Sequence, residues 1–368
     1  MFKKKPSTSQ QTDELDLKRL RPRAGELRRF ATGEALFFSP LPSPTGATPM
    51  DFDGHFLAVN EVYLDVGTSN YNKAFQTQLM VWGVMCLLIA SWILLPLCMG
   101  GVYLAGTYPT TFIENLNSIL SLQIAVSLWG GGAAAVIGLY VVIGSTCEKA
   151  RVRPLRFNRQ RREVCYLPEG SDTPIIQPWE DLVAWMSVST GYTGVAVMST
   201  YTFGMAVDNP VTDRVHFLTH GVLTPAHALG KWEAIRSFME KGPEHCPGVA
   251  PHESRATFDQ LRTNLHQSYR DGYASALKVF WFYLANVVTW WKFPYWVAEW
   301  DHRYSMKSMP ASVEEWSRPL PPAQWAKPSA ALLKQNAALE KSYAQGRNFM
   351  DHFAAEFDKA KTAEAPSG

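Results

Sequence analysis

The sequence predicts an α+β membrane protein, in which a two-helix transmembrane hairpin precedes a cytoplasmic β-rich module, an aromatic interfacial helix and a helical tail. Three observations lead to this fold class. Between Lys73 and Glu148 the chain carries a single charged side chain, Glu114. From residue 155 the hydrophobic pattern alternates as in strands, and residues 274–300 gather apolar and aromatic side chains. Each observation predicts a separate part of the chain.

Two long apolar runs fill the charge-poor stretch, at residues 79–104 and 119–145, with a connection at residues 105–118 between them. Each run exceeds the roughly 20 helical residues that cross a hydrocarbon core about 30 Å thick. A buried helical pair in a soluble protein is the alternative, but such helices usually keep a charged face, which these runs lack. We therefore interpret the runs as transmembrane helices.

The distribution of Lys and Arg predicts the orientation of the hairpin. Basic residues flank both runs, whereas the connection contains neither Lys nor Arg. Because basic residues are retained on the cytoplasmic side, both termini should be cytoplasmic and the connection periplasmic. Residues 1–50 are expected to be a disordered basic tail, and residues 51–78 a cytoplasmic pre-membrane segment. We expect no cleavable signal peptide, so the first run would be its own insertion signal.

Small residues at four-residue spacing predict a helix-packing face in the second run. Gly130, Ala134 and Gly138 form one such row, and Gly131 and Ala135 form a neighbouring one. Helices in lipid associate by close packing, which small side chains permit. The row would join either the two helices of one chain or two copies in a homo-oligomer, although Gly and Ala are also common in membrane helices generally.

A basic cluster follows the second run. Its seven residues are Lys149, Arg151, Arg153, Arg156, Arg159, Arg161 and Arg162. Such residues retain the segment in the cytoplasm and contact anionic lipid head groups, at roughly 1 kcal/mol per residue near the surface. The net charge of the whole chain is only +2, so nothing indicates nucleic acid as a partner.

A β-rich module is predicted over residues 149–243. Strand-like segments bounded by turn residues recur through it, around residues 155–157, 163–167, 175–176, 181–186, 195–199, 203–207 and 215–218. Thr224 and Pro225 then have the pattern of an N-cap and first helical residue, and Gly242 ends that amphipathic helix. Antiparallel strands followed by one helix resemble a small β-roll or a pleckstrin-homology-like module.

The third apolar stretch, residues 274–300, is rich in aromatic side chains. Its proposed interfacial anchors are Trp281, Trp290, Trp291, Trp296 and Trp300. Tryptophan favours the boundary between lipid and water, and the uncharged core of the stretch is short for a membrane span. We therefore favour an interfacial helix, with a third span and a buried soluble helix as alternatives.

The C-terminal part is predicted to hold an extended segment and a helix. Residues 310–328 are rich in Pro and Trp and suit an extended chain lying on a surface. Residues 330–361 have the pattern of a helix with an apolar stripe. Such a stripe usually docks on its own domain, and a partner or self-association is the alternative.

The sequence contains no recognisable catalytic or metal-binding constellation. His216, His220 and His227 come nearest, but residues four apart on a strand are separated by about 13 Å, too far to hold one metal. The five cysteines fit neither a zinc site nor a disulfide framework, and no phosphate-binding glycine loop or nucleophile elbow is present. We expect a non-enzymatic protein without catalytic residues, cofactor or metal; an enzyme would require the histidines to converge.

Three segments resemble an uncharacterised family, a domain of unknown function, of proteobacterial membrane proteins. They are Pro154–Val164, Pro178–Leu182 and Trp316–Pro328. The resemblance spans about residues 60–328 and implies a location in the bacterial inner membrane. It carries over no catalytic residues, because the family has none established.

Members of that family tend to be encoded beside type VI secretion effectors. The resemblance therefore implies an immunity or accessory role, with membrane lipids and a cognate toxin or secretion component as partners. The alternative is a membrane-anchored scaffold or regulator whose β-rich module binds lipid or protein.

Overall fold

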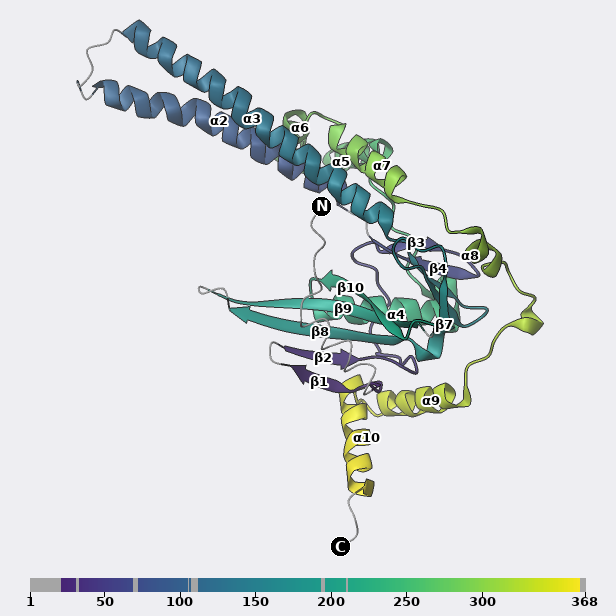
Figure 1. Ribbon diagram of the computed structural model, residues 1–368. Helices are drawn as coiled ribbons and strands as arrows, with labels where there is room; N and C mark the ends of the chain where they lie inside the picture. Colours follow the sequence, from purple (N-terminus) through teal and green to yellow (C-terminus); the bar gives the residue numbers. More distant parts are fainter. Residues whose placement is uncertain are drawn as a thin grey trace. The chain divides into compact units, whose positions relative to one another are not determined.

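The computed structural model describes residues 21–30, 33–68, 72–104, 106, 112–192, 196–209 and 211–364 (Figure 1). The chain divides into two units, each built from separate stretches of sequence. The β-rich unit takes in the described parts of residues 1–69, 152–250 and 308–368. The helical unit takes in those of residues 70–151 and 251–307. The chain thus leaves the β-rich unit twice, once for a long helical hairpin and once for shorter helices.

Two antiparallel five-stranded sheets form the β-rich unit. The first has the order β1-β2-β8-β9-β10, with bounds Leu27–Phe30, Gly33–Phe37, Val183–Tyr192, Val197–Asn209 and Arg214–Val222. The second has the order β3-β4-β5-β6-β7, with bounds Phe56–Val59, Tyr63–Val66, Leu155–Asn158, Glu163–Tyr166 and Ile175–Pro178. The hairpin β1-β2 joins the first sheet where β2 pairs with β8, in a register that places Phe37 opposite Trp185.

The N-terminal region is more ordered than the sequence analysis predicts. Strands β1 and β2 lie within residues 1–50, so disorder across that whole range is wrong, and residues 1–20 lie outside the described residues. Strands β3 and β4 likewise occupy the stretch predicted as a pre-membrane segment. This order has a physical cause. Leu36 and Phe38 are buried in the main core, and the free energy of their burial offsets the conformational entropy that this polar segment loses when it is ordered.

Most strands predicted downstream of residue 155 are present, with one difference. Residues 195–199 and 203–207 are predicted as two strands, but residues 197–199 and 203–207 belong to the single strand β9. Residue 196 precedes this strand, and residue 195 lies outside the described residues. The intervening Thr200, Tyr201 and Thr202 pair continuously with β8, as suits β-branched and aromatic side chains. A pleckstrin-homology-like fold stays a prediction.

Helix α4 (Pro225–Lys241) supplies the centre of the core. Trp232 is fully buried, its ring centroid lies 5.9 Å from that of Phe38 and 5.4 Å from that of Trp179, and its indole N–H donates to the Ser43 carbonyl at 3.0 Å. Apolar side chains from both sheets surround it. A buried indole with a satisfied N–H contributes packing without an unpaired polar group.

The predicted ends of α4 are confirmed. The Thr224 side chain accepts the backbone N–H of His227, and the helix stops before Gly242 at a φ of 117°. An N-cap hydroxyl satisfies one of the backbone donors that a helix leaves unpaired, and Gly tolerates positive φ.

The C-terminal segment forms three helices: α8 (Ala311–Trp316), α9 (Ala330–Ala344) and α10 (Phe349–Glu364). The single helix predicted over residues 330–361 is therefore wrong, because Gly346, at a φ of 77°, lies in the turn that separates α9 from α10. Leu339 and Phe353 enter the main core, so the apolar stripe docks on its own unit. Phe353 packs so closely that a Cβ at Gly25 would lie 1.9 Å from its ring.

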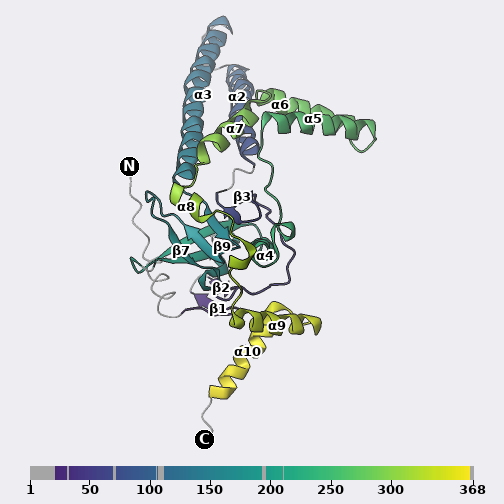
Figure 2. The ribbon, with the colours of Figure 1, turned by 90° about the vertical axis from the view of Figure 1, so that its right-hand side faces the viewer.

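The two apolar runs form the long helices α2 (Lys73–Leu104) and α3 (Phe112–Arg151), of 32 and 40 residues. Within them, Lys73–Cys98 and Asn117–Arg151 are long and apolar enough to cross a membrane. The prediction of two long apolar helices is confirmed. The helical unit also contains α5 (Arg255–Arg270), α6 (Ala276–Val288) and α7 (Phe293–Ser305), of which α6 and α7 contact α2 (Figure 2).

Residues 274–300 do not form one helix, whether interfacial or spanning. Helices α6 and α7 have 13 residues each, which is about 20 Å and short of a hydrocarbon core of roughly 30 Å. Trp290 and Trp291 separate them at φ values of 60° and 58°, and Pro294 occupies the first turn of α7. Positive φ at two successive bulky residues ends a helix.

Candidate functional site

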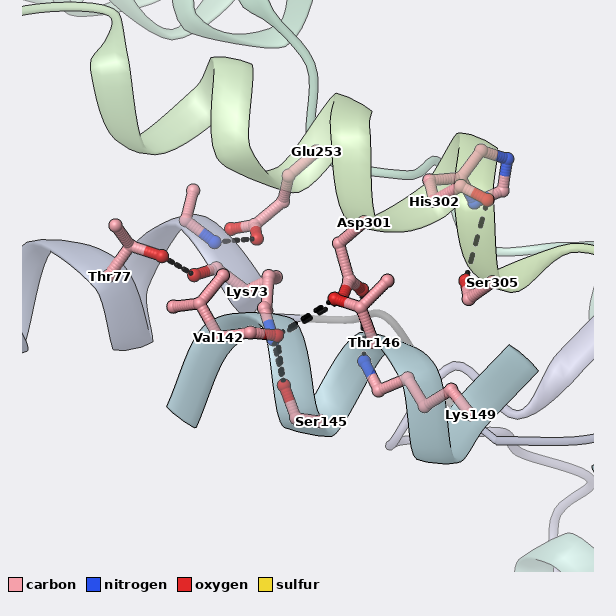
Figure 3. A network of polar contacts seen from close by, with 11 residues as sticks. Lys73, Thr77, Val142, Ser145, Thr146, Lys149, Glu253, Asp301, His302 and Ser305 are labelled. Carbon is pink, nitrogen blue, oxygen red and sulfur yellow. Dashed lines mark hydrogen bonds and ion pairs between the residues drawn. The ribbon is translucent and has the colours of Figure 1, made fainter. Parts of the chain in front are cut away.

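The open end of the α2–α3 hairpin brings its two terminal lysines together (Figure 3). Lys73 begins α2 and Lys149 lies in the last turn of α3, and the helices run antiparallel. The Lys73 ammonium donates to the Ser145 hydroxyl at 2.8 Å and lies 3.2 Å from Asp301 Oδ1. The Lys149 ammonium donates to Asp301 Oδ2 at 3.0 Å. We call Lys73, Lys149, Thr146 and Asp301 the lysine–aspartate site.

Asp301 is the centre of this site. Its carboxylate, on α7, is fully buried and also accepts the Thr146 hydroxyl. Burial raises the pKa of Asp301, but the Thr146 hydrogen bond and the charges of Lys149 and Lys73 outweigh burial and hold that pKa below its usual value. An ionised carboxylate with partners on both α2 and α3 therefore ties three helices together.

A second carboxylate caps α2 beside the site. Glu253 accepts the Ala74 backbone N–H at 2.6 Å, as Figure 3 shows. Burial raises the pKa of Glu253, although its hydrogen bonds to the backbone of Ala74 and Lys73 oppose that shift. A helix N-terminus favours a carboxylate because its first N–H groups lack partners inside the helix.

Polar side chains also pair between α2 and α3 farther along the hairpin. The Trp92 indole donates to the Ser127 hydroxyl at 2.9 Å, and the Gln123 amide lies 2.8 Å from the Ser91 hydroxyl. Gln123 is only 1% exposed. The large exposed side chains of the two helices are instead mostly apolar, and include Leu87, Ile93, Leu97, Leu128, Trp129, Val136, Ile137 and Leu139. This distribution is the reverse of a helix pair in water.

The predicted small-residue row is only partly a contact face. A Cβ at Gly138 would lie 2.8 Å from the Met80 sulfur of α2, whereas one at Gly130 would meet nothing within 4 Å. Gly131, from the neighbouring row, faces Leu88. Gly131 and Gly138 are seven residues apart, the repeat that keeps one face of a helix towards its partner. Gly138 thus joins the two helices of one chain.

Most of the predicted lipid-contacting basic residues have partners inside the protein. Arg156 is buried and makes two hydrogen bonds to the Asp65 carboxylate, at 2.7 and 2.8 Å, and Arg162 is buried against Glu240 at 2.8 Å. The prediction that Arg156 and Arg162 contact lipid is therefore wrong, because a buried guanidinium paired with a carboxylate does not reach a head group.

The other basic residues differ in exposure. Arg161 donates to the Trp316 carbonyl at 2.9 Å, Arg153 donates to the Ser308 carbonyl, and Arg159 lies 5.4 Å from the Trp325 ring. Lys149 belongs to the lysine–aspartate site. Arg151 is exposed at the end of α3, and lipid contact by this residue stays a prediction.

The proposed aromatic anchors divide into two groups. Trp281, Trp290 and Trp296 are exposed, whereas Trp291 packs on Phe258 at 5.1 Å and Trp300 is partly buried. Helix α6 exposes further apolar side chains beside Trp281, namely Leu277, Phe280 and Val287. An exposed apolar face on a short helix is typical of a segment lying at a lipid surface.

The three histidines do not converge on one another. His216 packs on Tyr166, His220 on His55 and His227 on Phe52, with ring centroids 5.2, 4.7 and 4.2 Å apart. In the part of the chain that the structure describes, no three His, Cys, Asp or Glu residues are placed to hold a metal ion.

The family described as "Family of unknown function (DUF6708)" matches residues 133–321, which is just over half of the chain. The chain belongs to this DUF6708 family. No curated protein and no solved structure matches it. The matched range includes Thr146, Lys149 and Asp301 but not Lys73, so three of the four residues of the lysine–aspartate site lie inside it.

Sequence reasoning missed Asp301 in this DUF6708 chain. It interpreted Lys73 as a topology signal, and Lys149 as a topology signal and a lipid contact. The helices of the predicted hairpin run antiparallel, so both lysines fall at one end, where two ammonium groups need a nearby carboxylate. Asp301, which follows the last of the aromatic anchors, was the signal available.

Replacing Asp301 with Ala should destabilise the helical unit by about 3–5 kcal/mol, because it leaves two ammonium groups without their carboxylate. Thermal and denaturant unfolding of the full chain in detergent would measure the change. Arg303→Ala is the matched control, since Arg303 is exposed on the same helix and its loss should cost within about 0.5 kcal/mol. Equal stability of the two variants would show that Asp301 does not hold the helices together.

Proposed function

We propose that this protein is an integral membrane protein that acts by binding, with the α2–α3 hairpin crossing the bilayer. The observation that carries the proposal is the reversed polarity of the hairpin. Gln123 and Thr146 are buried while Leu128, Trp129 and Ile137 are exposed. Each large apolar side chain left in water forgoes about 1.5–3 kcal/mol, and lipid removes that cost.

The charges of the helical unit support a cytoplasmic position for both termini. Lys73, Lys149 and Arg151 lie at the same end of the hairpin, where the chain enters α2 and leaves α3. Basic residues are retained on the cytoplasmic side of an inner membrane. The exposed tryptophans of α6 and α7 suit the head-group level of that side.

The partner that we propose is a toxin. Resemblance to proteobacterial membrane proteins encoded beside type VI secretion effectors supports an immunity or accessory role. Such a protein would act by occupying or occluding the toxin, which requires a binding surface and no catalytic group. Its hairpin would lie where a membrane-active or periplasm-delivered toxin arrives.

A second candidate function, a membrane-anchored scaffold or regulator, is favoured by the ribbon of β8 and β9. Strand β2 pairs with β8 only as far as Ser189, and β10 pairs with β9 only as far as Tyr201. The outer part of the ribbon extends beyond both of these neighbouring strands. Tyr192, Val197 and Met198 are 74%, 70% and 63% exposed there. Exposed apolar side chains on an open-edged ribbon suit docking of another protein.

The full chain should remain in the membrane pellet after alkaline carbonate extraction, because two lipid-spanning helices are not released by removing electrostatic contacts. Fractionation followed by immunoblotting measures this outcome, with a peripheral membrane protein as the control that is released. Recovery of this chain in the supernatant would contradict a transmembrane hairpin.

Co-expression with the effector encoded beside it should restore growth to cells that the effector alone kills. Colony counts measure protection, and Tyr192→Lys tests whether the ribbon provides it. Loss of protection while the protein stays in the membrane would assign toxin binding to the ribbon, whereas protection that survives this substitution would assign it to another surface. Full lethality despite normal expression would remove the immunity proposal.

A further inference from the structure

The helical unit contains an apolar groove of about 480 Å³ next to the lysine–aspartate site. Helices α2, α3 and α7 form its walls, with Met80 and Val84 from the first, Ala134 and Gly138 from the second, and Trp296 and Trp300 from the third. None of the side chains that line it is charged. Thr77 is polar, but its hydroxyl donates to the Lys73 carbonyl at 2.9 Å. An apolar occupant therefore matches this groove.

The groove exists because small residues form its α3 wall. Ala134, Ala135 and Gly138 present little more than backbone, while Trp296 and Trp300 stand opposite on α7. Larger side chains at these α3 positions would fill the space. The row that sequence analysis interpreted as a helix-packing face thus has a second consequence, an open slot beside the α2–α3 contact.

Volume decides between a helix and a lipid chain as the occupant. One turn of a helix with its side chains fills roughly 400–600 Å³, so the groove would seat about one turn. Helix pairs in membranes need contacts over several turns. A volume of about 480 Å³ instead lies within the range that holds one small molecule.

Charge complementarity indicates which lipid. The groove ends at Ile143 and Trp300, and the next turns of the same helices carry Thr146, Lys149 and Asp301. There two ammonium groups share the Asp301 carboxylate, while Glu253 faces the N-terminus of α2. The Lys149 side chain is 20% exposed. An anionic head group above the groove would meet these cations.

We propose that this groove binds one acyl chain of an anionic phospholipid, whose phosphate lies at Lys149. The inference rests on the proposed membrane location. The bound lipid fills the space between the hairpin and α7, and so stabilises the same three helices that Asp301 connects. It is a specific ligand of the protein, retained when the surrounding bilayer is replaced by detergent.

Native mass spectrometry of the full chain, purified in mild detergent, tests the proposal. The wild type should carry one phospholipid per chain. Ala134→Phe should lose it, because the ring fills the groove, and Ala133→Phe should keep it, because Ala133 is exposed on α3 and does not line the groove. Val84→Phe, from the α2 wall, should repeat the loss if Ala134→Phe fails to fold. After delipidation, phosphatidylglycerol should bind about fivefold tighter than phosphatidylcholine with identical chains, and Lys149→Gln should reduce that preference.

Three results would overturn the proposal. The first is a wild-type protein that carries no bound lipid, and the second is equal lipid retention by Ala134→Phe and Ala133→Phe. The third is a wild-type dimer that Ala134→Phe dissociates, which would assign the groove to a helix of a second copy. Carbonate extraction of each variant shows whether the lipid-binding proposal fails alone or the proposed membrane location fails with it. A chain that stays in the membrane without retained lipid contradicts the groove alone, and a chain released from the membrane contradicts both.

Discussion

The buried carboxylate of Asp301 is the interaction on which the helical unit depends. It lies on α7 and is separated by more than a hundred residues from both lysines that it contacts, so it closes the unit across the chain. Removing charges from water costs several kcal/mol per ion, which is recovered only when partners and hydrogen bonds are well placed. The Thr146 hydroxyl and the two ammonium groups meet that requirement.

Away from this site, the hairpin relies on forces that also operate in lipid. The hydrophobic effect does not draw two helices together in a bilayer, so close packing and interhelical hydrogen bonds must do so. Gly138 provides the close approach to α2. Gln123 pairs with Ser91, and Trp92 with Ser127, between the helices. Charge pairing at one end and small or polar contacts along the length therefore both hold the helices of this unit together.

Local patterns predicted the parts of the fold that depend on neighbouring residues. The two apolar helices and the Thr224 cap follow from composition and spacing over a few turns. Contacts between distant segments were not predictable in this way. Arg156 donates to Asp65, which lies 91 residues away in the chain, and the sequence analysis interpreted this arginine as a lipid contact. The helix break at Trp290 was missed for another reason, because bulky residues at positive φ carry no composition signal and the surrounding packing imposes them.

The polarity of the hairpin surface is the central claim, and spin-label accessibility in lipid bilayers tests it most directly. Labels would replace Trp129, 78% exposed in the middle of α3, and Arg151 at its end, in a chain whose five cysteines are substituted. We predict that the label at position 129 collides with oxygen and is shielded from a water-soluble nickel complex, and that the label at position 151 shows the opposite. Equal access of the nickel complex to both labels would contradict a hairpin embedded in lipid.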